Sequence, residues 1–304
     1  MGHALAEQAV GISVTANSRG RRRIGGYVLP GDTVWLERTI RQYYPLLDEL
    51  VVPVPDNQLG WTGVPIPVDE ALAVIRAADT RGILRVISGR WTDKDNPMRA
   101  DTAQRQAAVD ALSDTVDWIL QIDNDEFLPH PERLEEALDD ADRRGIAALE
   151  WPMRVLYRRT RRHVFEVVTR NGGHRYDYPG PIAVRAGVQL TDARRTSGDF
   201  LRLLVEGDAG SLQVNRRPEP GEHRLGYLTH DQAIVHNSWA RDPAAMRQKL
   251  SSWGHARKGG FNDYYWLKWW PSPLLWRLQR DLHPFAKGLW PALRPRANDG
   301  ELAD

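Results

Sequence analysis

The chain has 304 residues, with 41 Lys and Arg against 40 Asp and Glu residues and a formal net charge of +1. This length can bury a large core, which predicts one large α/β domain with a terminal extension or two small domains, while the balanced charge gives no global nucleic-acid-binding signature. The absence of cysteine excludes disulfides, thiolate zinc sites and a cysteine nucleophile, and fits a reducing compartment.

The amino-terminal residues 1–7 lack the long apolar core of a signal peptide. No uninterrupted apolar run in the sequence approaches the roughly 20 residues that a membrane-spanning helix needs. We therefore expect a cytoplasmic protein, with peripheral contact at the inner face of a membrane as an open alternative.

The first half of the chain predicts strands and helices in alternation. A helix is capped at Asp32 or Thr33 and ends before Pro45, and a further helix is capped at Asp101. Another helix opens at residues 68–70. The predicted strands cover residues 11–16, 50–54, 83–87 and 118–122. This alternation is typical of a parallel sheet flanked by helices.

A basic, glycine-rich stretch at residues 19–26 follows the first predicted strand. Backbone N–H groups and guanidinium groups in such a loop suit a diphosphate, and Arg21 is the residue that we select for this role. A solvated basic turn explains the stretch equally well, because the glycine spacing matches no phosphate-binding motif.

Acidic residues follow the apolar strand at residues 118–122. Asp123 and Asp125 are two positions apart on extended chain, so their side chains point the same way. In open α/β sheets the carboxyl ends of the strands are where ligands bind. Two carboxylates at one point favour a cation between them, and Mg²⁺ or Mn²⁺ bridging to a substrate diphosphate would supply it. A solvated strand end is the alternative interpretation.

The second half predicts a helix at residues 131–144, strands at 146–151, 181–185 and 200–205, and a loop at 211–225. Another apolar strand then ends at His236, and a helix follows that contains Lys249. An imidazole together with two carboxylates suits Mn²⁺. A histidine at a strand end is more often structural, and a helix lysine more often faces solvent.

The order of these motifs resembles the GT-A glycosyltransferases, especially the bacterial family 2-like enzymes, over residues 11–128. The Asp123-Asn124-Asp125 sequence is similar to their Asp-X-Asp motif for metal and nucleotide-sugar, and the His236 strand with its Lys249 helix resembles their late element. The resemblance implies a GT-A fold in the α/β class, with a mainly parallel central sheet flanked by helices. It also implies that His236 is a third metal ligand and that Arg105 faces the nucleotide-sugar.

The implied activity is metal-dependent transfer of a sugar from a nucleotide-diphosphate sugar to a glycan or lipid-linked acceptor, with inversion. An inverting enzyme also needs a carboxylate that accepts the proton of the acceptor hydroxyl. Asp231 is our first choice and Glu150 a further candidate. Three other carboxylates stay open as well: Asp177, Glu206 and Asp208.

The carboxy-terminal part is rich in tryptophan, since six of the twelve tryptophans occur at or after Trp253. Lysine and arginine alternate with these aromatic residues, which is typical of a segment lying at a lipid interface. A helical layer that packs its aromatic side chains on the main domain is the alternative, which we prefer slightly. From Arg294 onward we expect a disordered tail.

We therefore predict a catalytic domain at residues 1–250, divided into a nucleotide-sugar half at 11–128 and an acceptor half at 129–250. Residues 251–304 form an aromatic-rich helical extension. Two other functions stay open. One is a nucleotidyltransferase of related fold, and the other is a non-catalytic module that docks on carbohydrate or membrane through its tryptophans.

Overall fold

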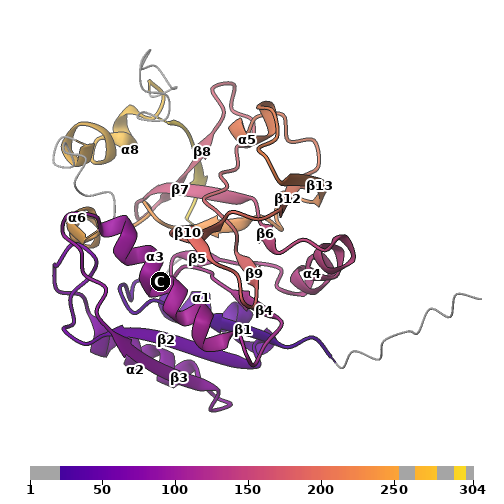
Figure 1. Cartoon of the computed structure of the whole chain (residues 1–304). Coiled ribbons are helices and arrows are strands. Elements are labelled where there is room, and N and C mark those ends of the chain that lie inside the picture. Colours follow the sequence, from indigo (N-terminus) through magenta and orange to yellow (C-terminus); the bar gives the residue numbers. More distant parts are fainter. Residues whose placement is uncertain (1–20, 253–263, 279–290, 299–304) are drawn as a thin grey trace, which may run out of the picture.

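The computed structural model describes residues 21–252, 264–278 and 291–298 (Figure 1). The larger sheet of this part is eight-stranded, in the order β13 (Glu222–Leu228), β12 (Phe200–Val205), β6 (Ala148–Glu150), β9 (Ala183–Arg185), β4 (Trp118–Leu120), β1 (Ile24–Tyr27), β2 (Glu49–Pro55) and β3 (Leu84–Gly89). Only β9 in this sheet runs antiparallel to its neighbours, β4 and β6. The predicted α/β class with a mainly parallel central sheet is confirmed.

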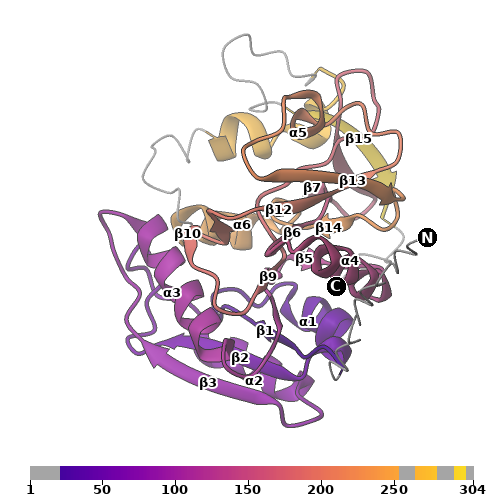
Figure 2. The same cartoon turned by 45° about the vertical axis from the view of Figure 1, so that its right-hand side comes forward.

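Helices cover both faces of this sheet (Figures 1 and 2). The covering helices are α1 (Leu36–Tyr43), α2 (Val68–Ala78), α3 (Pro97–Leu112) and α4 (Glu132–Arg144). The described residues before 253 also form η1 (Tyr44–Leu46), α5 (Leu212–Asn215) and α6 (Pro243–Ser252). The strand side chains alternate between the two faces. Val51 and Ile119 pack with α3, whereas Leu50, Val52 and Leu120 pack in the core that contains α1, α2 and α4.

A second, five-stranded sheet lies above the larger one in Figure 1, in the order β15 (Ala292–Ala297), β8 (His163–Val168), β7 (Met153–Arg159), β14 (Ile234–His236) and β5 (Glu126–Phe127). A ribbon of β10 (Leu190–Asp192) and β11 (Arg195–Thr196) completes the described strands. Because β5 directly follows the Asp123–Asp125 stretch, the second sheet extends from the end of β4 in the first.

The first described strand, β1, overlaps the stretch at residues 19–26 that was predicted to be a loop. Residues 11–16 lie outside the described residues, and β1 instead contains Gly25 and Gly26. A Cβ atom on Gly25 would lie 2.9 Å from Leu112, and one on Gly26 would lie 2.9 Å from Leu47. These glycines are therefore strand residues that let neighbouring side chains approach closely, and not part of a phosphate-binding loop.

The helices predicted in the first 250 residues are present, and so are the strands that begin near residues 50, 83, 118, 146, 181 and 200. The loop predicted at residues 211–225 is wrong in part, because α5 and the beginning of β13 lie within it.

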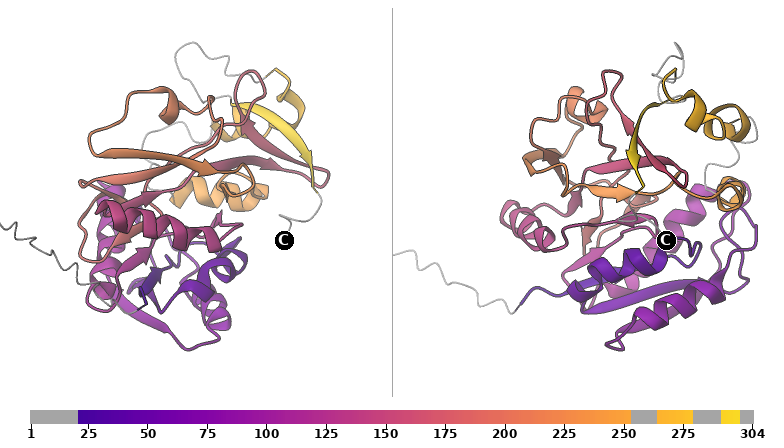
Figure 3. Two further views of the ribbon diagram at one scale, coloured as in Figure 1. Left: turned by 90° about the vertical axis from the view of Figure 1, so that its right-hand side faces the viewer. Right: turned by 180° about the vertical axis from the view of Figure 1, so that it is seen from behind.

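The carboxy-terminal segment contributes helical turns and one strand. The π-helical η3 (Tyr265–Trp269) contains Trp266 and Trp269, while Trp270 follows it and Trp276 follows the short α8 (Ser272–Leu275). The prediction of a disordered tail from Arg294 is wrong for residues 294–298, since β15 pairs antiparallel with β8 (Figure 3). The division of the chain at residue 250 stays a prediction. Within the described ranges, every helix is too short or too polar to cross a lipid bilayer.

Candidate functional site

A cavity of about 380 Å³ opens at the carboxyl edge of the larger sheet. Loops that follow the parallel strands β1, β2 and β4 form one side of it, and α3 and the segment from His236 to Lys249 form another. Ligands bind in open α/β sheets at this edge. The residues that carry charge there are Asp32, Asp101, Arg105, Asp123, Asp125, Glu126, Arg194, Arg241 and Lys249.

The pairing of β5 with β14 brings the two sequence motifs together. Glu126 lies opposite His236 in this antiparallel pair. The backbone N–H of Asn237 also donates to the carbonyl oxygen of Asp125 at 2.8 Å. His236 is therefore held beside Asp125, and its Nε2 lies 3.6 Å from Oδ1 of that carboxylate.

Asp125 is buried and surrounded by cationic groups. Its Oδ2 accepts hydrogen bonds from Lys249 Nζ at 2.6 Å and from Arg241 Nη2 at 2.8 Å. Burial alone would raise the pKa of Asp125, but Lys249, His236 and Arg241 outweigh it and hold the pKa well below the ordinary value. Asp125 is thus an ionised carboxylate at neutral pH, with Oδ1 on the side of His236.

Asp123 faces the arginine of α3. Arg105 Nη1 lies 2.9 Å from Asp123 Oδ1, and Arg105 Nε donates to Asp101 Oδ1 at 2.6 Å. Burial acts to raise the pKa of Asp123, but Arg105 and Arg194 outweigh it, so the pKa is lowered. One guanidinium thus bridges two carboxylates beside the cavity, and its contact with a nucleotide-sugar stays a prediction.

The residue between the two aspartates positions the loop after β1. Asn124 Nδ2 donates to the carbonyl oxygens of Leu29 at 2.8 Å and Asp32 at 2.9 Å. The carbonyl of Asn124 accepts from Thr39 Oγ1 at 2.8 Å. The middle residue of the Asp-X-Asp motif therefore connects the loop after β1 to the end of β4 beside the cavity, a role that its sequence position alone did not indicate.

A divalent metal fits part of this donor set. Asp125 Oδ1 and His236 Nε2 are 3.6 Å apart, a spacing that one ion of the Mn²⁺ or Mg²⁺ kind can bridge after a small adjustment. Asp123 is instead directed to Arg105. The chemistry of these donors thus fits a metal held by Asp125 and His236, and Asp123 as a further ligand stays a prediction.

Three predicted site residues lie outside the cavity. Arg21 precedes β1, at the amino edge of the sheet, and its guanidinium is 3.8 Å from Asp48. Glu150 is buried in an ion pair with Arg202 at 2.7 Å. Asp231 is exposed and accepts a hydrogen bond from Thr229 at 2.6 Å. The geometry therefore corrects the phosphate role of Arg21, and it gives neither Glu150 nor Asp231 access to a substrate in this cavity.

The other open candidates for the base, Asp177, Glu206 and Asp208, are not among the lining residues either. Conversely, the sequence interpretation missed Arg194, which forms a bidentate pair with Glu126 at 2.6 and 2.7 Å. It also missed Arg241, which pairs with both Asp32 and Asp125. Arg241 precedes the helix that carries Lys249, a position that could have signalled it. Arg194 lies in the short β10–β11 turn, where no periodic pattern points to a site.

No protein-family model and no curated protein matches the sequence. Among solved structures, the chain is similar to a 4-diphosphocytidyl-2C-methyl-D-erythritol synthase from Anaerococcus prevotii, with 11% identity over 54% of this chain and 70% of that chain and a TM-score of 0.32.

A second 4-diphosphocytidyl-2C-methyl-D-erythritol synthase has 16% identity over 55% of this chain and 77% of that chain, with a TM-score of 0.32. A CMP:2-keto-3-deoxy-manno-octonic acid synthetase in complex with CTP has 14% identity over 48% of this chain and 62% of that chain, with a TM-score of 0.28. These TM-scores are too low to carry a functional argument.

Proposed function

We propose that this protein is a nucleotide-dependent transferase that binds its donor in the cavity at the end of β4, and more specifically a glycosyltransferase that uses a nucleotide-diphosphate sugar. The observation that carries the proposal is the convergence on Asp125 of His236 and Lys249, two residues that lie more than 100 positions downstream. It supports the resemblance to GT-A enzymes, in which a strand ending in His and a helix bearing Lys accompany the Asp-X-Asp motif.

The charge balance of the cavity supports a metal-dependent donor site. Its lining contains five carboxylates, and the four Lys and Arg side chains among the described lining residues already pair with them: Arg105, Arg194, Arg241 and Lys249. A diphosphate would add negative charge to a cavity without a surplus of positive charge. An accompanying divalent cation at Asp125 and His236 would compensate it, as the family resemblance implies.

The residues of this chain then have distinct tasks. When bound, the metal ion would neutralise the negative charge that develops on the leaving diphosphate. Lys249 and Arg241 hold Asp125 ionised so that its Oδ1 can bind the cation, and Arg105 orients Asp123 beside it. Transfer to a glycan or lipid-linked acceptor, with inversion, belongs to the proposal through the resemblance alone.

Nucleotidyl transfer is the second candidate, because the same cavity could hold a nucleoside triphosphate with its metal. Such enzymes usually have a glycine-rich loop with Lys or Arg directly after their first strand. Here residues 28–34 follow β1 and contain one glycine and no Lys or Arg. This loop composition favours the glycosyltransferase proposal.

Calorimetric titration tests the donor site. We expect UDP or GDP to bind in the presence of Mn²⁺, and we expect EDTA or Asp125→Ala to abolish that binding. Asp56→Ala, an exposed aspartate outside the cavity, is the matched control. Nucleotide binding that neither EDTA nor Asp125→Ala changes would contradict the proposal.

The reaction products separate the two candidates. Incubation with nucleotide-sugars should release a nucleoside diphosphate in a metal-dependent manner if the protein transfers sugars. Incubation with nucleoside triphosphates should release pyrophosphate if it transfers nucleotidyl groups. Release of pyrophosphate without any turnover of nucleotide-sugars would replace the first candidate by the second.

Contact with an anionic membrane surface is a separate part of the proposal. Between residues 264 and 278, six large apolar side chains are exposed: Trp266, Leu267, Trp270, Leu274, Leu275 and Leu278. This segment also contains Lys268 and Arg277 and has no acidic residue. Exposed tryptophan and leucine with basic residues suit the headgroup region of anionic lipid.

Sedimentation with vesicles tests this contact. We expect the protein to bind phosphatidylglycerol vesicles more strongly than phosphatidylcholine vesicles. The double variant L267E/L274E should lose most of that binding, while Leu212→Glu, an equally exposed leucine on α5, should keep it. Equal behaviour of the two variants would remove the membrane contact from the proposal.

A further inference from the structure

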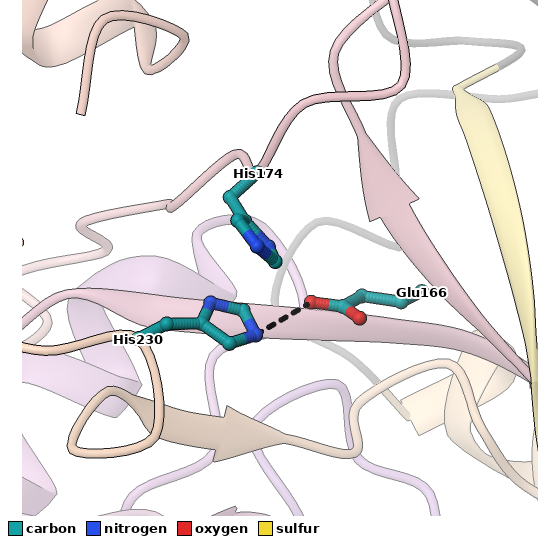
Figure 4. Close-up of side chains that lie close together, drawn as sticks. All are labelled: Glu166, His174 and His230. Carbon is teal, nitrogen blue, oxygen red and sulfur yellow. Dashed lines mark ion pairs between the residues drawn. The ribbon is translucent and has the colours of Figure 1, made fainter. Parts of the chain in front are cut away.

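A second group of metal-ligating side chains lies outside the cavity, on the five-stranded sheet. Glu166 comes from β8, His174 from the loop after β8, and His230 from the turn between β13 and β14. Their side chains point toward one another in Figure 4. One ligand atom from each lies within 4.8 Å of the others, and within the described ranges this is the only such group of three.

We propose that Glu166, His174 and His230 form a binding site for a divalent transition-metal ion of the zinc type, separate from the donor cavity. Two imidazoles and one carboxylate are a ligand set that suits Zn²⁺, Ni²⁺ or Cu²⁺, whereas Mg²⁺ and Ca²⁺ prefer oxygen ligands throughout. The proposal is independent of the proposed transferase function, because none of the three residues lines the cavity.

The hydrogen bonds around His230 orient it as a ligand. Its Nδ1 is 2.8 Å from the hydroxyl of Tyr176, and its Nε2 is 4.0 Å from Glu166 Oε1. Arg154 Nη1 also lies 3.0 Å from Nε2. Because a guanidinium can only donate, Nε2 is unprotonated and its lone pair accepts this hydrogen bond, so the ring is neutral. Second contacts of this kind, here with Tyr176, typically fix the orientation of a metal-bound imidazole.

The two oxygens of the Glu166 carboxylate have different neighbours. Its Oε1 faces His230, as the dashed line in Figure 4 marks. Its Oε2 lies 3.4 Å from Arg294 and 3.6 Å from Arg296, both on the adjacent strand β15. Oε1 is therefore available to an ion while the arginines of β15 hold Oε2. The carboxyl group is almost fully buried, so a positive ion at Oε1 would be weakly screened.

Guanidinium groups compete with the ion for the imidazole nitrogens. Arg154 occupies His230 Nε2, and Arg294 Nη2 lies 3.1 Å from His174 Nδ1. A tetrahedral ion with bonds of about 2.0–2.1 Å needs its ligand atoms roughly 3.3–3.4 Å apart. Binding thus requires both arginines to leave the imidazoles and the two histidines, which lie in loops, to rotate toward Glu166.

The test uses tag-free protein that has been dialysed against a chelator and then titrated with Zn²⁺. We expect one Zn²⁺ per chain, with an affinity that His174→Ala or His230→Ala weakens by about tenfold or more. His163→Ala, which replaces an exposed histidine on β8 outside the proposed site, is the matched control. Asp125→Ala, which disables the proposed donor site, should still bind this Zn²⁺, because the three ligands lie outside the cavity.

Removing a competing arginine provides a second variant with the opposite effect. Arg294→Met frees Nδ1 of His174, so we expect Zn²⁺ to bind about three- to tenfold more tightly. This gain does not depend on whether the histidine variants fold. Absence of stoichiometric Zn²⁺ binding to both wild type and Arg294→Met would overturn the proposal. So would binding that disappears in Asp125→Ala but survives in the H174A/H230A double variant.

Discussion

Lys249 and Asp125, separated by 124 positions in the sequence, form an ion pair of 2.6 Å in the cavity at the end of β4. The same Nζ donates to Ser238 Oγ at 2.7 Å, so the lysine connects α6, the segment after β14 and the end of β4. The pair therefore joins the two segments that the family resemblance had related only through their order.

Loss of Lys249 should affect both stability and donor binding. Lys249→Met leaves Asp125 with Arg241 as its cationic partner beside His236, and we expect the free energy of unfolding to fall by about 1–3 kcal/mol. The metal-dependent affinity for a nucleoside diphosphate should fall as well. Chemical denaturation and calorimetry measure the two effects. A variant with unchanged stability and affinity would show that the pair contributes nothing in solution.

Arg105 should be more sensitive than an ordinary helix arginine. Its guanidinium is buried between Asp101 and Asp123, so Arg105→Met leaves the buried Asp101 and the partly buried Asp123 with reduced compensation. We expect a loss of about 3–5 kcal/mol in the free energy of unfolding. Arg99→Met, an exposed arginine on the same helix, is the control and should change stability by less than about 1 kcal/mol. Similar losses in the two variants would contradict the buried bridge.

Asp79 gives a prediction about pH. Burial alone would raise its pKa, but hydrogen bonds from the hydroxyl of Tyr44 and from the backbone N–H groups of residues 82, 83 and 84 outweigh burial and lower the pKa. A carboxyl whose pKa is lower in the folded state stabilises the protein above its unfolded pKa, about 4, and loses that contribution as the pH falls further.

Asp79→Asn should therefore be less stable than wild type at pH 7, and the difference should shrink below about pH 4. Denaturant titrations at several pH values measure it, and Asp114→Asn, an exposed aspartate in the turn after α3, is the control. A difference that stays constant down to pH 3 would argue against a lowered pKa for Asp79.

The glycines of β1 should not tolerate a side chain. A Cβ atom at residue 26 would lie 2.9 and 3.1 Å from the two methyl groups of Leu47, a residue without solvent exposure. We expect Gly26→Ala to destabilise the fold by about 1–3 kcal/mol through overpacking. Gly198→Ala, which meets no atom within 4 Å, is the control. Thermal melting compares the two, and equal melting temperatures would mean that Leu47 repacks without cost.

The sequence by itself determined the alternation of strands and helices in the first half of the chain and the position of Asp123 and Asp125 at a strand end. Trp118, Ile119 and Leu120 are buried on both faces of the sheet, as an uninterrupted apolar strand predicts. These features depend on local periodicity and on turn residues, and both can be read from each short segment of the sequence alone.

The place of β1 was decided by tertiary packing. The predicted strand at residues 11–16 lies outside the described residues, whereas Gly25 and Gly26, predicted to be in a loop, lie in β1 and admit Leu112 and Leu47. Which glycine tolerates such close approach depends on neighbours that lie 21 and 87 residues further along the chain. The local sequence pattern around the glycines gives no information about these distant neighbours.

The composition of the site was likewise decided by the tertiary structure. Strand pairing between β5 and β14 brings His236 to Asp125, while Glu150 and Asp231 end in other surroundings. Arg194 enters the cavity from a short turn, and Arg241 enters it from the segment between β14 and α6. A residue type and its neighbours in sequence indicate what chemistry a side chain offers, but the register between distant strands determines which side chains meet.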